Sequence, residues 1–276
     1  MYDVVALGEL LIDFTTQSTD ADGYPTMAAH PGGAPANFLA AVAQFGGKAA
    51  LLGKVGTDTF GKLLTGTLRK AGIETKGIVA SDDVFTTLAF VTLDENGDRE
   101  FAFARKPGAD TQLRFEELDL SILDETRVFH FGTLSLTDEP ARGTTYRAVE
   151  YAKAHGKLVT FDPNLRRPLW KSLDDAKEQM LWGLDHADVV KISDEEIEFL
   201  FGLGVQDGAQ YILEHFPVRL VFATCGAEGC WFQNRNAGGH VNSLKDIKVV
   251  DTTGAGDIFG GSAVWKLSLI HISEPT

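Results

Sequence analysis

The sequence has few cysteines, fewer basic than acidic residues, and no long hydrophobic run. Its 276 residues include only Cys225 and Cys230, whereas a zinc site usually needs four Cys or His ligands at short spacings. Lysine and arginine number 25 against 39 aspartate and glutamate, so the net charge of −14 repels nucleic-acid phosphates and anionic lipid. No apolar stretch approaches the ~18 residues of a membrane span. These absences argue against zinc, nucleic acid and membrane as partners, and they favour two buried, reduced thiols.

The start of the chain shows no signal peptide, because Met1-Tyr2-Asp3 leads into an apolar run that is too short for one. We therefore expect a cytoplasmic protein. A length of 276 residues with 44% hydrophobic and 23% charged residues is typical of a globular protein with one large domain. We expect that single domain to cover residues 1–276.

Short apolar runs alternate with segments of helical periodicity along most of the chain. The runs are bounded by Gly, Asp or Pro, as in a parallel sheet that is covered on both faces. The expected strands are 4–7, 49–52, 128–131, 158–161, 189–192 and 220–223. The expected helices are 37–45, 61–71, 139–155, 174–184, 194–200 and 207–215. This alternation predicts an α/β fold with a doubly wound, mainly parallel sheet flanked by helices.

Two segments, residues 10–31 and 84–105, depart from this alternation and predict a small projecting β-sheet. In the second segment two β-rich runs flank Asn96-Gly97, a strong hairpin signal. A projecting sheet beside a ligand crevice would act as a lid. The end of the chain, residues 267–276, has neither a helix cap nor a closing strand. We expect a truncated C-terminus with a foreign tail there.

The most specific motif is Asp251-Thr252-Thr253-Gly254-Ala255-Gly256-Asp257, between an apolar run at 247–250 and a helical segment from Ile258. Its small residues free backbone N–H groups at a helix start, which together form an anion site. Asp257 would then accept a proton from an attacking hydroxyl, as phosphoryl transfer requires. Alternatively, the motif is only a glycine-rich turn with Asp257 in the first helical turn. A Walker loop is excluded because no Gly-Lys-Ser/Thr follows.

A second glycine-rich cluster, Pro31-Gly32-Gly33-Ala34-Pro35-Ala36-Asn37, opens the first expected helix. Paired glycines let a polyol approach the backbone, and the Asn37 amide both donates to and accepts from hydroxyl groups. Alternatively, Asn37 is only the N-cap of the helix. The G-x-G-x-x-G spacing of a dinucleotide site is lacking.

Together these two motifs resemble the paired motifs of the ribokinase-like (phosphofructokinase-B) carbohydrate kinase family, and the resemblance extends over essentially the whole chain. Within the family the sequence is most similar to the fructokinase subgroup, on residues 8–13, 31–37 and 162–166. Further segments that match the family are 53–61, 129–135 and 224–229. The resemblance implies the ribokinase-like fold, with ATP and Mg²⁺ as cofactors.

The resemblance also implies roles for individual residues. Asp257 corresponds to the catalytic base, and the N–H groups of Gly254, Ala255 and Gly256 correspond to the anion hole. Residues that correspond to contacts with the sugar or its phosphate are Asp13, Gly32, Gly33, Asn37, Arg105 and Arg166. Alternatively, Arg105 is a solvated lid charge and Arg166 belongs to a salt bridge at a strand end.

On the nucleotide side, the family's Asn-x-x-Glu motif falls on residues 193–196, where Ser193 replaces Asn. Glu196 would organise Mg²⁺ through water, or would be a plain carboxylate on a helix face. Asp251 and Thr253 correspond to ligands of a monovalent cation such as K⁺. The residues that correspond to the nucleotide site are Lys191, Ser193, Glu196, Thr224, Gly226 and Gly229.

The resemblance therefore predicts ATP-dependent phosphorylation of a sugar primary hydroxyl, with D-fructose as substrate and fructose 6-phosphate as product. One alternative is a 2-keto-3-deoxygluconate kinase or another sugar kinase of the same fold. Another is a truncated, non-catalytic remnant that binds sugar but not ATP. We expect His130 and His186 to be structural, and the lid to pair two chains into a homodimer.

Overall fold

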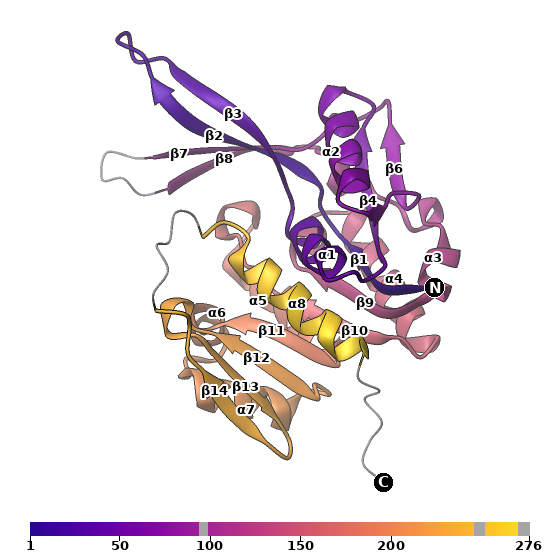
Figure 1. Ribbon diagram of the computed structural model, residues 1–276, viewed down its shortest axis with the longest axis vertical. Coiled ribbons are helices and arrows are strands. Elements are labelled where there is room, and N and C mark those ends of the chain that lie inside the picture. Colours follow the sequence, from indigo (N-terminus) through magenta and orange to yellow (C-terminus); the bar gives the residue numbers. More distant parts are fainter. Residues whose placement is uncertain (94–98, 246–251, 270–276) are drawn as a thin grey trace.

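A ten-stranded sheet forms the centre of the computed structural model, which describes residues 1–93, 99–245 and 252–269 (Figure 1). Its strand order is β14-β13-β12-β11-β10-β9-β1-β4-β5, with β6 also paired to β4. All pairs are parallel except β12 with β13 and β13 with β14. The strands are β1 Tyr2–Leu7, β4 Ala49–Gly56, β5 Ile73–Glu74, β6 Ile78–Ser81, β9 Thr126–Gly132, β10 Leu158–Asp162, β11 Val189–Ser193, β12 Leu220–Thr224, β13 Cys230–Asn234 and β14 Gly238–Val241.

Helices cover both faces of this sheet, which confirms the predicted doubly wound α/β fold. Alternate residues of β1 enter the two cores: Val5 and Leu7 pack with α4 to α7, whereas Val4 and Ala6 pack with α1, α2 and α8. The helices are α1 Ala34–Gln44, α2 Thr59–Lys70, α3 Leu120–Asp124, α4 Ala141–Ala154, α5 Leu173–His186, α6 Asp194–Phe201, α7 Val205–His215 and α8 Ala255–Leu269. Short 3₁₀ turns lie at Ala109–Gln112, Phe115–Glu117, Leu134–Leu136, Arg167–Leu169 and Gly226–Glu228.

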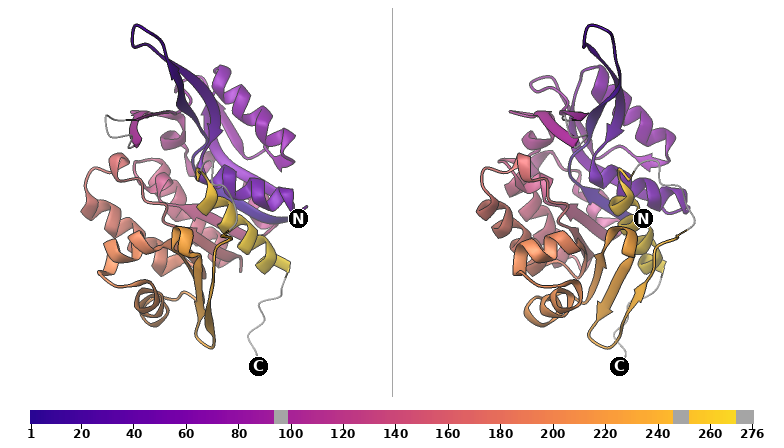
Figure 2. Two further views of the ribbon diagram at one scale, coloured as in Figure 1. Left: turned by 60° about the vertical axis from the view of Figure 1, so that its left-hand side comes forward. Right: turned by 90° about the vertical axis from the view of Figure 1, so that its left-hand side faces the viewer.

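The second sheet projects from the main body as a long four-stranded lid, which confirms the predicted small β-sheet (Figures 1 and 2). Its order is β3-β2-β7-β8, where β2 is Leu11–Thr19, β3 Pro25–Gly32, β7 Leu88–Leu93 and β8 Arg99–Ala104. Strands β7 and β8 pair antiparallel, as the hairpin prediction requires, although Asn96-Gly97 lies outside the described residues.

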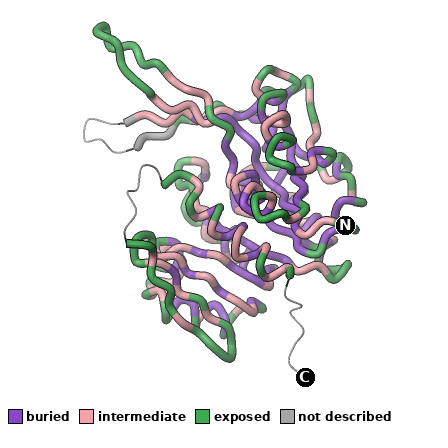
Figure 3. The backbone as a smooth tube through the Cα atoms, viewed as in Figure 1, coloured by how far each residue is buried: buried purple, intermediate pink, exposed green. Residues whose placement is uncertain are grey.

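Burial in the lid decreases from its base to its tip (Figure 3). Near the base, Phe14 stacks on Phe90 at a ring distance of 5.2 Å, and Phe60 of α2 meets Phe14 edge-on at 5.6 Å. Towards the tip, Tyr24 is 69% exposed. The base of the lid is therefore anchored on the main domain by aromatic contacts, whereas its far end extends into solvent.

Helices α1 and α8 lie unusually close together although they are far apart in the sequence (Figure 1). A Cβ atom at Gly261 would lie 2.1 Å from the carbonyl oxygen of Phe38, so only glycine fits at this crossing. Further along, Trp265 stacks on Phe45 at 5.0 Å. These two contacts hold α8, whose first turn contains Asp257, against α1 along its length. None of the helices that the structure describes is long and apolar enough to cross a membrane.

Candidate active site

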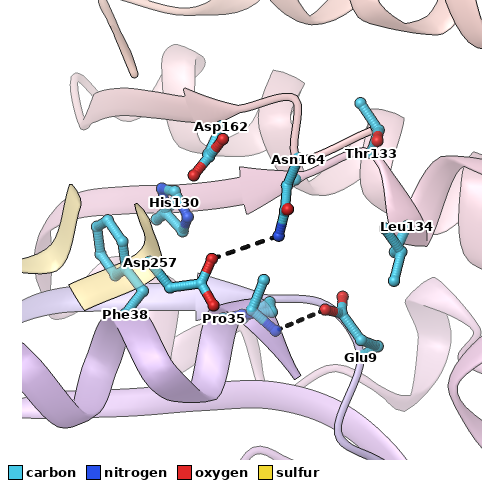
Figure 4. Close-up of a pocket in the computed structure, with 11 residues that line it drawn as sticks. Glu9, Pro35, Phe38, His130, Thr133, Leu134, Asp162, Asn164 and Asp257 are labelled. Carbon is cyan, nitrogen blue, oxygen red and sulfur yellow. Dashed lines mark hydrogen bonds between the residues drawn. The ribbon is translucent and has the colours of Figure 1, made fainter. Parts of the chain in front are cut away.

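A pocket that is open to solvent lies where β1, β9 and β10 end and where α1 and α8 begin (Figure 4). In open α/β sheets, ligands bind in the crevice at the carboxyl ends of the strands. The pocket is lined by Glu9, Ala34, Pro35, Phe38, His130, Gly132, Thr133, Leu134, Asp162, Asn164 and Asp257.

Asp257 lies in the first turn of α8, and its carboxylate accepts hydrogen bonds from two amides. Asn37 donates to one oxygen at 3.0 Å. Asn164 donates to the other at 3.4 Å (Figure 4). The side chain is 7% exposed, and burial raises its pKa, partly offset by the Asn37 hydrogen bond and by the charges of Lys191 and Arg166. A carboxylate with a raised pKa that is held in a fixed orientation is well suited to accept a proton.

The glycine-rich turn before α8 brings backbone N–H groups and a cation together. Gly254 has φ of 74°, and a Cβ atom there would lie 3.1 Å from the Asn37 amide nitrogen. A Cβ atom at Gly256 would lie 3.0 Å from Nζ of Lys191, so this ammonium group adjoins the start of α8. Free N–H groups at a helix N-terminus beside a cation form an anion site. Of the three predicted donors, the Ala255 N–H already donates to the Thr252 carbonyl at 3.1 Å. The structure thus brings Lys191 to the predicted anion hole.

Lys191 and Asp162 form a buried ion pair under this turn, with 3.2 Å between Nζ and a carboxylate oxygen. Burial alone would lower the pKa of Lys191. The negative charges of Asp162 and Glu196 raise it by more than burial lowers it, so the pKa lies above its usual value. Burial raises the pKa of Asp162 to about 7, despite the opposing effect of Lys191. The lysine therefore remains positively charged at the site.

The predicted sugar contacts Asp13, Gly32, Gly33 and Asn37 lie next to this pocket but are not among the residues that line it. A Cβ atom at Gly32 would lie 2.1 Å from an Asp13 carboxylate oxygen, so the strand passes directly beside that carboxylate. Burial raises the pKa of Asp13. The charge of Arg166 lowers this pKa and the charge of Asp257 raises it, so the three charged groups are close enough to interact.

The alternative role for Asn37, that of helix N-cap, is wrong. Helix α1 begins at Ala34 and Gly33 is its N-cap, with φ of 118°. A Cβ atom at Gly33 would lie 2.5 Å from the carbonyl oxygen of Glu9. Glycine is therefore needed at this position both for the positive φ and for the lack of space. The Asn37 amide points instead to Asp257.

Arg105 is predicted to contact substrate, but the structure does not bring it to the pocket surface. It is 5% exposed and donates to Asp110 at 2.8 Å, to the Thr137 hydroxyl at 2.8 Å and to the Leu134 carbonyl at 2.8 Å. The alternative of a solvated lid charge is wrong, because the guanidinium is buried. Arg105 instead supports the pocket wall from behind, since Leu134 lines the pocket.

Arg166, by contrast, is exposed beside the site. It acts electrostatically on both Asp13 and Asp257. The structure shows no ion pair for Arg166 with any described residue, so the strand-end salt bridge is not observed.

On the nucleotide side, Ser193 and Glu196 form a capping box at the start of α6. The Ser193 hydroxyl accepts from the Glu196 N–H at 3.2 Å, and the Glu196 carboxylate accepts from the Ser193 N–H at 2.8 Å. The other Glu196 oxygen accepts from the Leu165 N–H at 2.8 Å, and the residue is 7% exposed. A plain helix-face carboxylate is therefore not what is observed.

The loop after β12 holds the other predicted nucleotide residues. Thr224 lies opposite Ser193 in the β11–β12 register. Gly226 and Gly229 have φ of 51° and 102°, and a Cβ atom at Gly229 would lie 2.0 Å from the Val241 carbonyl oxygen. These glycines allow a tight turn beside α6. Of the two predicted ligands of a monovalent cation, Thr253 precedes α8 and Asp251 lies outside the described residues.

Four polar pocket residues carry no role in the sequence-based prediction: Glu9, Thr133, Asp162 and Asn164. Each follows or ends a strand of the parallel sheet, and position at a carboxyl end is the signal that marks such residues as site candidates. His130 also lines the pocket, but its role is structural as predicted. It stacks on Phe38 at 3.7 Å, and burial lowers its pKa to about 3.

The donor set fits Mg²⁺ only as an ion that arrives with phosphate groups. Throughout residues 1–93, 99–245 and 252–269 no three His, Cys, Asp or Glu side chains are clustered to hold a metal. Glu196 retains free lone pairs on both oxygens after accepting one N–H each. Mg²⁺ commonly keeps several waters and binds through one or two carboxylates plus phosphates, which suits this arrangement.

Comparison with known proteins agrees with this geometry. The profile of the pfkB family of carbohydrate kinases matches residues 1–269. The chain is 43% identical to probable fructokinase-4 of Arabidopsis thaliana over 267 residues, covering 96% of this chain and 82% of that protein. The fructokinase of Xylella fastidiosa with bound ATP superposes with a TM-score of 0.89 at 33% identity, covering 98% and 82%. The fructokinase of Vibrio cholerae O395 with fructose, ADP and calcium ion gives 0.85 at 33%, covering 98% and 85%.

Proposed function

The chain belongs to the pfkB family of carbohydrate kinases, and from this premise we propose that it transfers the γ-phosphoryl group of ATP to the primary hydroxyl of D-fructose. The product is fructose 6-phosphate. The observation that carries this proposal is the buried Asp257 carboxylate, held by Asn37 beside the glycine-rich start of α8. The proposal of fructose and ATP is supported by the ligands of the two similar fructokinase structures.

In the proposed reaction Asp257 accepts the proton of the sugar hydroxyl, while the oxygen of that hydroxyl forms a bond to the γ-phosphorus of ATP. The bond from phosphorus to the β,γ-bridging oxygen breaks, and ADP leaves with that electron pair. The N–H groups of Gly254 and Gly256, together with Lys191, stabilise the negative charge on the phosphoryl oxygens. The Ala255 N–H, which donates to the Thr252 carbonyl in the free protein, would join them by giving up that acceptor. Lys191 suits this role because its ammonium adjoins the turn and remains charged.

The sugar would lie between the lid and the Gly32-Gly33 turn, with Asp13 and Asn37 as partners for its hydroxyl groups. Thr224, Gly226 and Gly229 would line the ATP phosphates, and Mg²⁺ would be organised through water by Glu196. When bound, the metal neutralises phosphate charge. Closure of the lid would exclude water and limit ATP hydrolysis. A monovalent cation at Asp251 and Thr253, a homodimer through the lid and a cytoplasmic location stay predictions.

The reaction is tested by initial rates of ADP formation with fructose, ribose, 2-keto-3-deoxygluconate and nucleosides, each with Mg-ATP. We expect fructose to give the highest kcat/KM. Arg166 is the observation that favours the second candidate, because an exposed guanidinium beside Asp13 suits the carboxylate of a sugar acid. A preference for 2-keto-3-deoxygluconate would replace fructose as substrate. Calorimetry that shows sugar binding without ATP binding would instead identify a non-catalytic remnant.

The base is tested by Asp257→Asn, which we expect to lower kcat by about 10³ while fructose affinity changes little. The matched control is Asp188→Asn. Asp188 is also a hydrogen-bonded carboxylate, but it accepts from the Val159 N–H near the start of β10, at 2.8 Å, and does not line the pocket. The control is expected to lose stability but to keep kcat. If Asp257→Asn retained wild-type kcat, Asp257 would not be the base.

A further inference from the structure

All four strands of the lid enter and leave the main domain at one place. Strands β2 and β7 run parallel and both begin there, while their antiparallel partners β3 and β8 both end there. The residues at these four junctions are Glu9 before β2, Gly33 and Ala34 after β3, Thr87 before β7 and Arg105 after β8. Any motion of the lid relative to the main domain must act through these junctions.

A buried polar cluster lies at this place. Glu9, Thr87, Arg105 and Asp110 are 3%, 0%, 5% and 6% exposed. The Thr87 hydroxyl donates to one oxygen of Asp110, and Arg105 donates to the other at 2.8 Å. Asp110 thereby ties the start of β7 to the end of β8. Because these groups are buried, each unmade hydrogen bond would carry a desolvation penalty.

Glu9 makes the corresponding tie between β2 and β3. Its carboxylate accepts from the N–H of Ala34 at 2.7 Å, directly after the Gly32-Gly33 turn (Figure 4). Its carbonyl oxygen lies so close to Gly33 that no Cβ atom fits there. The carboxylate and the backbone carbonyl of Glu9 therefore both adjoin the turn that we assign to sugar binding.

The two ties are also connected to each other. The Ile12 N–H of β2 donates to the Thr87 carbonyl at 3.1 Å, which joins the starts of β2 and β7. The charges of Arg105 and Asp110 both act on the carboxylate of Glu9. Arg105 further donates to the carbonyl of Leu134, which lines the same pocket as Glu9.

We propose that Glu9 is a positioning residue that, together with the Thr87–Asp110–Arg105 cluster, clamps the lid junctions and holds the Gly32-Gly33 turn in place for the sugar. The clamp itself follows from contacts in the free protein, whereas its effect on sugar affinity rests on the proposed function. Glu9 does not take part in proton transfer; it acts through the backbone of the turn.

The variants that test the clamp are Glu9→Ala, which removes the acceptor, and Glu9→Gln, which retains one. The matched control is Glu117→Ala, because Glu117 likewise accepts from a backbone N–H, that of Arg114 at 2.8 Å, and from the buried Lys54 at 2.6 Å, but lies away from the lid. The Glu117 side chain is 29% exposed, so the comparison concerns where each variant loses protection and not how much stability it loses.

The first measurement is amide hydrogen exchange of the free enzyme, followed by mass spectrometry on peptides from β2 and β3. Loss of a buried hydrogen bond predicts exchange about tenfold faster in the lid of Glu9→Ala, with α4 and α5 unchanged. Glu9→Gln is expected to exchange like wild type. Equal protection of the lid in Glu9→Ala and Glu117→Ala would overturn the clamp, whatever the substrate proves to be.

The second measurement is steady-state kinetics with fructose and ATP. Glu9→Ala is expected to raise the KM for fructose about tenfold while the KM for ATP stays within about twofold, and Glu9→Gln restores the fructose KM. A fructose KM unchanged in Glu9→Ala overturns the positioning role. If wild type does not phosphorylate fructose at all, the proposed function fails, and the exchange experiment still decides the clamp.

Discussion

The close crossing of α1 and α8 permits a sharp test of the site through a residue that touches no substrate. In Gly261→Ala the new Cβ atom would lie 2.1 Å from the Phe38 carbonyl oxygen, whereas real Cβ atoms essentially never approach closer than 3.0 Å. The obstacle is backbone, so one helix must move relative to the other by about 0.9 Å. Such overpacking costs about 1–3 kcal/mol, and better helix propensity of alanine returns less than about 1 kcal/mol.

This displacement acts on the carboxylate of Asp257, the proposed base. Asn37 lies next to Phe38 on α1, and Asp257 lies one turn before Gly261 on α8. Moving the helices apart lengthens the Asn37–Asp257 hydrogen bond from 3.0 Å to about 4 Å, which breaks it. A misplacement of about 1 Å in a reacting group can cost about 10²-fold in rate. We therefore expect kcat to fall about 100-fold in a protein that remains folded.

The assay is kcat for fructose phosphorylation alongside the free energy of unfolding in urea. The matched control is Gly66→Ala, because Gly66 lies inside α2 and an alanine methyl group there would have no other atom within 4 Å. That control is expected to gain about 0.5–1 kcal/mol and to keep kcat. If Gly261→Ala retained kcat within about twofold, the helix crossing would not position Asp257, and the reasoning would be refuted.

Three further outcomes follow from single groups. Burial raises the pKa of Glu9 from 4.5 to about 7, so the folded protein favours the neutral carboxyl group. The contribution of the neutral group to the free energy of unfolding is therefore present in full below pH 4.5 and is lost as the pH rises through 7. Urea unfolding at pH 5 and pH 8 should therefore show Glu9→Gln gaining about 3 kcal/mol relative to wild type, and no pH-dependent difference would contradict the burial argument. Ser193→Ala removes the cap of α6 and should lower stability by about 1 kcal/mol in the same assay; an unchanged value would mean that Glu196 alone holds the helix start. Lys191→Met should weaken ATP binding by calorimetry at least about tenfold, at unchanged fructose affinity, because it removes the cation at the anion site.

The sequence predicts the main sheet well because its strands are buried on both faces and therefore appear as continuous apolar runs. Strand β1 is an example, with Val4 to Leu7 at most 1% exposed. Strands β13 and β14 are absent from the prediction because they form an edge hairpin in which residues such as Phe232 and Val241 are exposed. Their short, mixed pattern gives no periodic signal.

The site is predicted where its chemistry resides in a local motif and not where tertiary contacts decide it. The Gly254-Ala255-Gly256 turn and Asp257 are recognisable because their spacing is contiguous. Whether Arg105 reaches a substrate depends instead on Asp110, Leu134 and Thr137, which occupy its donors in the folded chain. Similarly, nothing local distinguishes Glu9 from an ordinary residue after a strand. The fold class and the family are confirmed, while a single domain over residues 1–276 stays a prediction.

The hydrogen bond between Asn37 and Asp257 joins residues that are 220 positions apart. A ribosome that adds about 5–20 residues per second needs roughly 10–45 s to make the intervening chain. During that interval the turn to which we assign sugar binding has been made, but Asp257, its proposed catalytic partner, has not. A nascent chain therefore has no means of consuming ATP until α8 has emerged and docked on α1. The order of synthesis itself keeps unfinished copies of the enzyme silent.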